Sequence, residues 1–281
     1  MEKMTTTKVL QSKGKQKLTM LTAYDYLMAK LFDSAGIDIL LVGDSMGHVV
    51  YGYGSTIPVT LKQTINHCKA VTAGAKTYSL IVGDMPFLSY GVSLEKTVEN
   101  AGRIMKESNV EAVKLEGGSA RSNEIEACIE IGIPVMGHLG LTPQSVNKFG
   151  GYKVQGKSIE MAEHLISEAE ALTNAGCFSI VLEAVPWQVA KIITETISVP
   201  TIGIGAGPYC DAQVLVWPDA LGLFDDFIPK FVKQFANVKE VMLEGLKNFK
   251  SEIKNGTFPD KVTHSYQFPE NELKAWSRWK D

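Results

Sequence analysis

Short apolar runs alternate with longer amphipathic segments along most of the chain. Runs that are rich in Val, Ile and Leu and bounded by Gly or Pro are typical of buried parallel strands. We expect eight such strands, at Leu18–Ala23, Ile39–Gly43, Ser79–Gly83, Ala112–Leu115, Pro134–Gly137, Ser179–Leu182, Thr201–Ile204 and Val214–Trp217. Helical patterns lie between them, at Thr60–Ala75, Leu94–Ser108, Asn123–Ile131, Ser158–Ala175 and Trp187–Ile197.

Eight strands that alternate with helices predict an α/β protein of the closed (β/α)8 TIM-barrel type. An open doubly wound sheet is the alternative, but the repeat shows no break that would favour it. Because such barrels use about 250 residues for one domain, we expect residues 1–281 to form a single barrel. It would carry a short N-terminal lead-in and a C-terminal tail that is helical over Phe227–Lys254. The last stretch contains Trp276 and Trp279, which we expect to pack on a neighbouring subunit or to be loosely held.

Composition excludes several classes of partner. The net charge is −3 and no basic block stands out, which argues against nucleic acid. No apolar run approaches the roughly 20 residues that a membrane span needs. The four cysteines are far apart and form no CxxC pair, which is typical of free thiols in a reducing cytoplasm.

Four of the apolar runs end on a carboxylate, at Asp44, Asp84, Glu116 and Glu183. A buried carboxylate is costly unless something pairs with it, and the carboxyl ends of barrel strands form the active face. Oxygen ligands of this kind suit Mg²⁺. A single such Asp would more simply cap a helix, but four in register, with His138 at the end of the fifth strand, predict a metal site with a base beside it.

Lys114 lies two residues before Glu116, so strand alternation places both in the barrel interior. Three interpretations stay open for this lysine: a charge partner of Glu116, a Schiff-base lysine, or a cation that binds a substrate carboxylate. For His138 a hydrogen-bonded core residue and a pocket residue are both open. Gly203, Gly205 and Gly207 do not fit a dinucleotide-binding motif. Two interpretations stay open for them: they form an anion-binding loop, or they let the backbone pass close to the pocket.

At these residues the chain closely resembles the ketopantoate hydroxymethyltransferase (3-methyl-2-oxobutanoate hydroxymethyltransferase) family. The resemblance runs from about Thr19 to about Pro259. The segments that carry it are Thr22–Asp25, Leu41–Ser45, Pro58–Thr60, Asp84–Phe87, Val113–Gly118, Gly137–Ser145, Gly150–Gly156, Leu182–Glu183 and Ile202–Gly207.

The resemblance implies a barrel of the phosphoenolpyruvate/pyruvate type, Mg²⁺, and a homodecamer. It implies transfer of a hydroxymethyl group from methylene-tetrahydrofolate to 3-methyl-2-oxobutanoate through a Mg-stabilised enolate, giving 2-dehydropantoate for pantothenate biosynthesis. The implied metal residues are Asp44, Asp84 and Glu116, the implied substrate-binding residues are Asp44, Ser45, Asp84, Lys114 and His138, and the implied catalytic base is Glu183.

The chain departs from the family near the eighth strand, where Ala212 and Pro218 stand in place of the usual Gly and His. We expect a glycine-type backbone at Ala212, possible only with strain for alanine. Three other hypotheses remain from the residues alone. They are a metal-dependent lyase acting on a similar oxo acid, a Schiff-base aldolase using Lys114, and a barrel that has lost catalysis.

Overall fold

The eight predicted strands form a closed parallel barrel in the computed structural model, which describes residues 2–225 and 227–276. Each strand pairs with its neighbours in chain order, and β1 closes the barrel by pairing with β8. The strands are β1 (Leu18–Thr22), β2 (Ile39–Val42), β3 (Leu80–Asp84), β4 (Ala112–Glu116), β5 (Val135–Gly140), β6 (Ser179–Glu183), β7 (Thr201–Ile204) and β8 (Ala212–Leu215). The closed barrel is therefore confirmed, and the open sheet is not observed.

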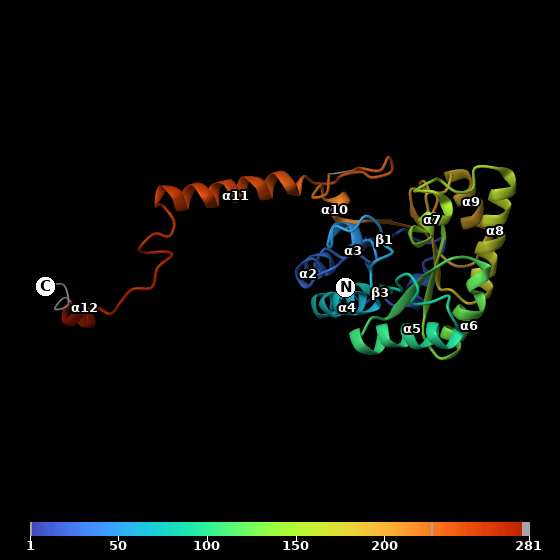
Figure 1. Cartoon of the computed structure of the whole chain (residues 1–281), viewed down its shortest axis with the longest axis horizontal. Coiled ribbons are helices and arrows are strands. Elements are labelled where there is room, and N and C mark those ends of the chain that lie inside the picture. The colour runs from blue at the N-terminus through green and yellow to red at the C-terminus, as the bar shows by residue number, and fades with distance from the viewer. Residues whose placement is uncertain (1, 226, 277–281) are drawn as a thin grey trace.

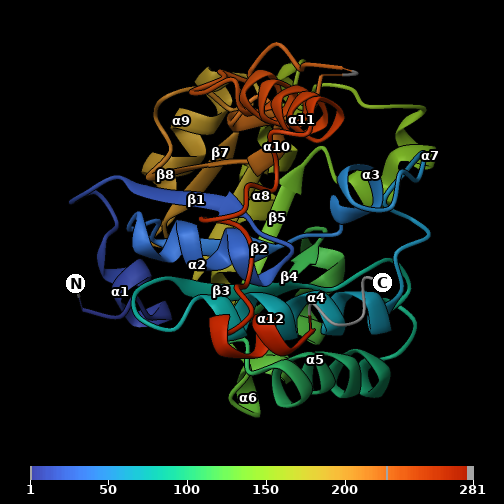
Figure 2. The same cartoon turned by 90° about the vertical axis from the view of Figure 1, so that its left-hand side faces the viewer.

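Helices surround the barrel, with α5 and α6 on one side of it and α9 on the opposite side (Figure 2). The longer helices are α2 (Tyr26–Ser34), α4 (Leu61–Gly74), α5 (Leu94–Ser108), α6 (Ser122–Glu130), α8 (Ile159–Asn174), α9 (Trp187–Thr196) and α11 (Val238–Asn255). The shorter ones are α1 (Thr6–Gln11), α3 (Met46–Val49), η1 (Ser119–Arg121), η2 (Pro143–Ser145), α7 (Val146–Phe149), α10 (Trp217–Ala220) and α12 (Glu270–Trp276).

Local capping explains where several of these helices begin. The side chains of Asp25, Thr60, Ser93 and Ser158 each accept a hydrogen bond from the backbone N–H three residues later. These bonds satisfy donors that the first helical turn leaves free. At the other end, α5 stops where Asn109 adopts a left-handed conformation with a φ of 58°. The structure confirms the helix predicted over Leu94–Ser108 with the same bounds.

Two apolar layers hold the barrel together. One fills its interior and includes Val82, Ala112, Met136 and Val181. The other lies between the strands and the surrounding helices and includes residues of the opposite strand face, such as Leu115. Successive strand residues point to opposite faces. A residue two positions after an interior residue of the same strand therefore also points into the barrel.

The eighth strand and the segment after it differ from prediction. The strand was expected over Val214–Trp217, but it starts at Ala212, where backbone pairing with Leu18 of β1 begins. Pro218 lies in the first turn of α10, a position that suits its fixed φ and missing N–H. The expectation for Ala212 was also wrong: this residue is extended, and the non-glycine residues with positive φ in the described part of the chain lie elsewhere.

The glycine-rich segment after β7 carries the backbone directly to β8. Residues 205–211, all of them described, contain no helix. Gly205 and Gly207 have φ values of 64° and 79°, and a Cβ at Gly207 would lie 2.3 Å from Cβ of Trp187. Of the two interpretations offered for these glycines, the structure favours close passage of the backbone.

The C-terminal tail was predicted as helix from Phe227, but α11 begins only at Val238. Pro229 disfavours helix in the residue before it, and the N–H groups of Phe235 and Val238 donate to Ala220 and Leu221 instead of forming a helical turn. Asn237 then caps α11 by accepting a hydrogen bond from the N–H of Glu240. Figure 1 shows α11 extending away from the barrel, with α12 at the far end of the tail. No helix in the described part of the chain is long and apolar enough to cross a membrane. Trp279 lies outside the described residues.

Candidate active site

The carboxyl ends of β2 to β6 bring the predicted site residues together. Asp84 and Glu116 are the last residues of β3 and β4, and the strand register sets them beside Lys114 and His138, respectively. Glu183 ends β6. Strand alternation places these side chains in the barrel interior, directly above its apolar filling. Asp44 and Ser45 follow β2 at the same end of the barrel.

Lys114 lies at the centre of this cluster and is only 3% exposed. Its Nζ is 2.8 Å from Asp84 Oδ1, 3.7 Å from Glu116 Oε1 and 3.2 Å from His138 Nδ1. Lys114 is therefore the closest charge partner of Asp84. One buried ammonium thus touches residues from three neighbouring strands, and its opposite charges are on Asp84 of β3 and Glu116 of β4.

His138 connects this group to Glu183. Its Nδ1 lies 3.4 Å from Glu116 Oε1, and its Nε2 lies 3.3 Å from Glu183 Oε2. Burial and Lys114 disfavour the charged imidazole, but Glu116 and Glu183 outweigh them and raise the pKa of His138 to about 9. Of the two interpretations of His138, a hydrogen-bonded core residue and a pocket residue, this placement between two carboxylates favours the second.

The acidic residues sit in a strongly negative environment. Burial, then Asp84 and Glu116, raise the pKa of Asp44 well above its usual range. Burial also raises the pKa of Asp84, although Lys114 opposes that shift. For Lys114, burial favours the neutral amine, but Asp84, Glu116 and Asp44 prevail and hold its pKa above the ordinary value. A bound cation would relieve the repulsion that these carboxylates exert on one another.

The donor set fits a divalent cation such as Mg²⁺. Asp84 Oδ1 and Glu116 Oε1 are buried, and their partners within the described part of the chain are the cationic groups of Lys114, at 2.8 Å from Asp84, and His138, at 3.4 Å from Glu116. Across residues 2–225 and 227–276, no three His, Cys, Asp or Glu side chains already form a complete ligand set. Mg²⁺ does not require one, because it keeps several waters and takes one or two carboxylates together with oxygen atoms of the substrate. Asp44 and Asp84 suit that role, since the Asp44 N–H donates to Asp84 Oδ2 over 3.2 Å.

Two residues of the site were not singled out from the sequence. Gln144, in η2 after β5, is 5% exposed and donates from Nε2 to Asp44 Oδ2. The phenol of Tyr90, in the loop after β3, donates to Gln144 Oε1. Both residues lie in loops, where no periodicity marks them. The sequence offers one weak indication of their role, which is that each is a polar residue in the segment that follows a predicted strand.

The backbone around Glu183 is unusually constrained. Gly140 of β5 has a φ of 90°, and a Cβ there would lie 2.2 Å from the carbonyl oxygen of Glu183. Ala184 follows with a φ of 49°, which costs a residue with a Cβ on the order of 1 kcal/mol. Backbone strain of this kind gathers at functional sites, where the surroundings over-determine it. Glu183 is thus held at a fixed place beside His138.

Two glycine-containing loops meet over the site. His48 in α3, after β2, and Tyr152, after β5, are joined by a hydrogen bond of 3.1 Å between Nε2 and the phenol. Burial, then Asp44, Glu183 and Glu116, raise the pKa of Tyr152, which places the phenol within reach of the field of the carboxylates. The loops after β2 and β5 therefore contact each other directly.

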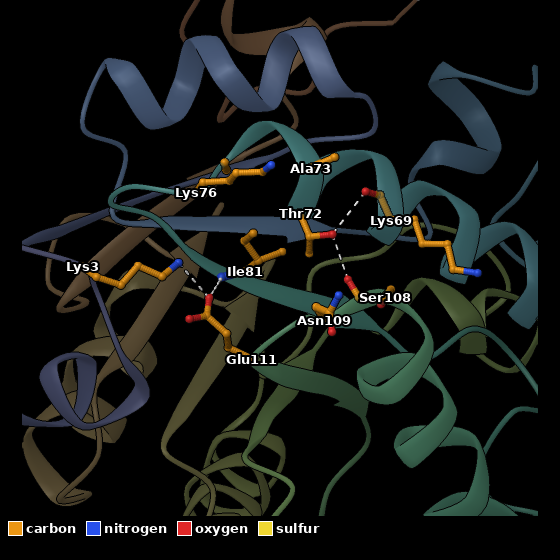
Figure 3. Close-up of a pocket in the computed structure, with 10 residues that line it drawn as sticks. Lys3, Lys69, Thr72, Ala73, Lys76, Ile81, Ser108, Asn109 and Glu111 are labelled. Atoms are coloured by element: carbon orange, nitrogen blue, oxygen red, sulfur yellow. Dashed lines mark hydrogen bonds and ion pairs between the residues drawn. The ribbon is translucent and has the colours of Figure 1, made fainter.

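A separate cavity of about 430 Å³ lies elsewhere in the molecule (Figure 3). It is lined by residues of α4, of the end of α5 and of the N-terminal segment, among them Lys3, Thr72 and Glu111. Lys3 is already paired with Glu111 at 3.0 Å. None of the carboxylates described above lines this cavity, so it is not part of the candidate active site.

Ser45 directly follows Asp44, and its Oγ lies 2.8 Å from the phenol oxygen of Tyr24. Ser45 precedes α3 but makes no capping bond with its side chain. The hydroxyl is therefore not committed to holding the helix and remains beside Asp44.

Solved structures share the fold at low sequence identity. Phosphonopyruvate hydrolase aligns with a TM-score of 0.59 and 10% identity, covering 99% of this chain and 97% of its own. A structure of phosphonopyruvate hydrolase with oxalate and Mg²⁺ aligns equally well. A 2,3-dimethylmalate lyase of the PEP mutase/isocitrate lyase superfamily aligns with a TM-score of 0.57 and 14% identity over 98% of both chains. The predicted (β/α)8 TIM barrel is confirmed.

Sequence relatives are much closer. The 3-methyl-2-oxobutanoate hydroxymethyltransferase of Clostridium beijerinckii is 55% identical over 260 residues, which cover 92% of this chain and 94% of the relative. The enzyme of the same name from Syntrophomonas wolfei is 56% identical over 249 residues, which cover 89% and 90%. The family described as ketopantoate hydroxymethyltransferase matches residues 3–261. This chain, an enzyme of the transferase class, therefore belongs to the ketopantoate hydroxymethyltransferase family.

Proposed function

We propose that this chain transfers a hydroxymethyl group from methylene-tetrahydrofolate to 3-methyl-2-oxobutanoate and forms 2-dehydropantoate. The observation that carries the proposal is the division of the site into two parts around Lys114 and His138. Asp44, Asp84 and Glu116 lie on one side, where a cation fits, and Glu183 lies on the other. Binding of an oxo acid and removal of its proton can therefore be assigned to different groups.

The oxo acid is an anion, and Lys114 is the buried cation that can receive its carboxylate. Ser45 Oγ, beside Asp44, can donate a hydrogen bond to the same molecule. Mg²⁺ held by Asp44 and Asp84, with Glu116 nearby, would draw electron density from the 2-oxo group and so acidify the proton on C3. Because three carboxylates keep Lys114 protonated, the residue suits charge neutralisation better than the Schiff base, which requires a neutral amine.

Glu183 then acts as the general base. Its carboxylate accepts the C3 proton, and His138, 3.3 Å away, holds the carboxylate in place by its Nε2. Water hydrolyses the methylene bridge of the folate, which breaks both C–N bonds, releases tetrahydrofolate and leaves the carbon at the oxidation level of formaldehyde. The nucleophilic C3 attacks that carbon, and its oxygen takes up a proton to complete the hydroxymethyl group. The loops that carry His48 and Tyr152 are placed to limit access of bulk water during this step.

We also propose that the enzyme works as a homo-oligomer in the cytoplasm, with the decamer that the family resemblance implies. None of the described residues of α11 is buried. Met242, Leu246, Phe249 and Ile253 recur at helical spacing and are all exposed. A helix with such an apolar stripe is stable when another surface covers it, and a second copy of the chain supplies one. Light scattering on the purified protein would measure the assembly. A reducing compartment agrees with the four free, buried cysteines.

A coupled assay tests the activity. Purified protein is incubated with 3-methyl-2-oxobutanoate and methylene-tetrahydrofolate, with Mg²⁺ or with EDTA, and 2-dehydropantoate is measured. We expect turnover that depends on both Mg²⁺ and the folate. Product formation with free formaldehyde but not with the folate would point instead to a lyase. Activity that survives EDTA, together with borohydride trapping of substrate on Lys114, would point to a Schiff-base aldolase.

A further inference from the structure

We infer that Gln144 and Tyr90 are positioning residues that orient Asp44 and Glu116 for the cation and the oxo acid. The inference rests on the proposed function, because the two carboxylates need a fixed orientation only if they hold a ligand. Neither residue ends a strand, and neither has a place in the chemistry described above. Their hydrogen bonds nevertheless converge on the site from two different loops.

Most of the hydrogen-bonding capacity of the Gln144 side-chain amide is satisfied within the site. Nε2 donates to Asp44 Oδ2 and to the carbonyl oxygen of Met85, both over 2.9 Å. The backbone N–H of Gln144 donates to Glu116 Oε2 over 3.1 Å. A single residue thus restrains one oxygen of each of two buried carboxylates. The second oxygen of each carboxylate, Asp44 Oδ1 and Glu116 Oε1, receives no hydrogen bond from Gln144.

Tyr90 fixes which way this amide points. The backbone N–H of Glu116 donates to the phenol oxygen over 3.2 Å, so the phenol hydrogen is free to donate elsewhere. It donates to Gln144 Oε1 over 2.6 Å. Because Oε1 is held by this donor, the amide cannot rotate by half a turn without placing its NH2 group against the phenol. Tyr90 therefore keeps the donor side of Gln144 turned toward Asp44.

The loop that carries Tyr90 is itself anchored from the helix layer. The N–H of Gly91 donates to Glu124 Oε1 over 2.8 Å, and Asn100 Nδ2 donates to the carbonyl of Ser89 over 2.7 Å. Both Glu124 and Asn100 are buried. The residues on either side of Tyr90 are thus tied to α5 and α6. Such outer contacts give a site the precision that loops alone do not provide.

The chemistry of an amide explains why glutamine suits this place. The carboxylates already repel one another, so a Glu at position 144 would add a further negative charge beside Asp44. A Lys there would neutralise Asp44 and compete with the cation. Gln is neutral, and its NH2 group can hold Asp44 and the carbonyl of Met85 at the same time.

The variants Gln144→Leu, Gln144→Glu and Tyr90→Phe test the inference. Mg²⁺ affinity is measured by titration calorimetry without substrate, and kcat and KM are measured in the coupled assay. We expect Mg²⁺ affinity to fall by about 10 to 100-fold in the Gln144 variants and by about 10-fold in Tyr90→Phe. We expect kcat to fall with it, while KM for the folate changes little.

Gln63→Leu provides the matched control. Gln63 also contacts a tyrosine, with Nε2 donating to the phenol of Tyr53 over 3.0 Å, but this pair belongs to the cap of α4. We expect the control to lower the melting temperature without changing Mg²⁺ affinity. If Gln144→Leu does not fold, Tyr90→Phe carries the test, because it removes one hydroxyl and keeps the ring.

The outcomes separate the inference from the proposed function. A wild-type protein that neither binds Mg²⁺ nor forms product refutes both. An active wild type with unchanged Mg²⁺ affinity and kcat in Tyr90→Phe and in either folded Gln144 variant overturns the inference alone. A loss of affinity in Gln63→Leu as large as in Gln144→Leu would show that general destabilisation is the cause, which also overturns it.

Discussion

Replacing Glu183 by Gln removes the proposed base while leaving the shape of the site intact. The backbone there is held independently of the side chain, because the carbonyl of Glu183 accepts from Leu141 N over 2.8 Å and Ala184 N donates to Ile204 O over 2.9 Å. The amide oxygen of Gln can still accept from His138 Nε2, which lies 3.3 Å from the present carboxylate. What the variant loses is the ability to accept a proton from C3.

The size of the effect follows from that single loss. A positioned general base contributes about 10² to 10⁴-fold to a rate, which corresponds to roughly 3 to 5.5 kcal/mol in the barrier. Oxo acid binding should change little, since Lys114 and the three carboxylates around it remain. We therefore expect kcat to fall by about two to four orders of magnitude, with the dissociation constant of the oxo acid within a factor of a few.

Proton exchange isolates this step from folate chemistry. Enzyme, Mg²⁺ and 3-methyl-2-oxobutanoate are incubated in D₂O without folate, and the C3 proton is followed by NMR. Wild type should exchange it, and Glu183→Gln should exchange it at the background rate. Glu195→Gln, on the exposed side of α9, is the control and should behave as wild type. Exchange at the wild-type rate in Glu183→Gln would refute the assignment and make His138 the next candidate.

Three further substitutions test the site and the fold. Asp84→Asn should weaken Mg²⁺ binding at least 10-fold in titration calorimetry while circular dichroism stays unchanged; retained tight binding would contradict its role as a ligand. Asp33→Asn should lower the free energy of unfolding by about 3 kcal/mol, since this carboxylate accepts hydrogen bonds from Thr77, Tyr78 and Ser79. Burial opposes the charged form of Asp33, but those hydrogen bonds prevail and lower its pKa. In denaturant titrations the difference in free energy of unfolding between wild type and variant should therefore be complete above about pH 4 and shrink below it. A difference that does not shrink at low pH would exclude the charged form of Asp33 as its cause. Ala212→Gly should lower the melting temperature by the equivalent of about 1 to 2 kcal/mol, because Ala212 is an extended, buried strand residue, and a more stable variant would count against this account.

The strand ends were predictable because they depend on local pattern. Period-two alternation, together with Gly and Pro at the boundaries, was enough to place Asp84, Lys114, Glu116 and Glu183 at one end of the barrel, where the structure has them. The same pattern could not reveal how these side chains pair. The closest ion pair, between Lys114 and Asp84, joins neighbouring strands whose register no single sequence specifies.

The eighth strand shows where pattern fails. Residues 212–217 are apolar enough to form a strand in either of two positions, and pairing with β1 decides between them. The glycine proposed for position 212 came from resemblance, and the extended backbone at Ala212 does not require it. Likewise, the start of α11 depends on Pro229 and on the cap at Asn237, which outweigh the amphipathic pattern before them.

The site contains more acidic than basic side chains. Asp44, Asp84, Glu116 and Glu183 face only Lys114 and His138 as cations among the described residues of the cluster. An anionic oxo acid entering alone would meet this excess of negative charge at low dielectric, where repulsion is strong. A bound divalent cation would offset that excess, so the proposed function makes the cation and the oxo acid interdependent ligands. A neutral amide at Gln144 can hold Asp44 in place without disturbing the balance, which a charged side chain there would do.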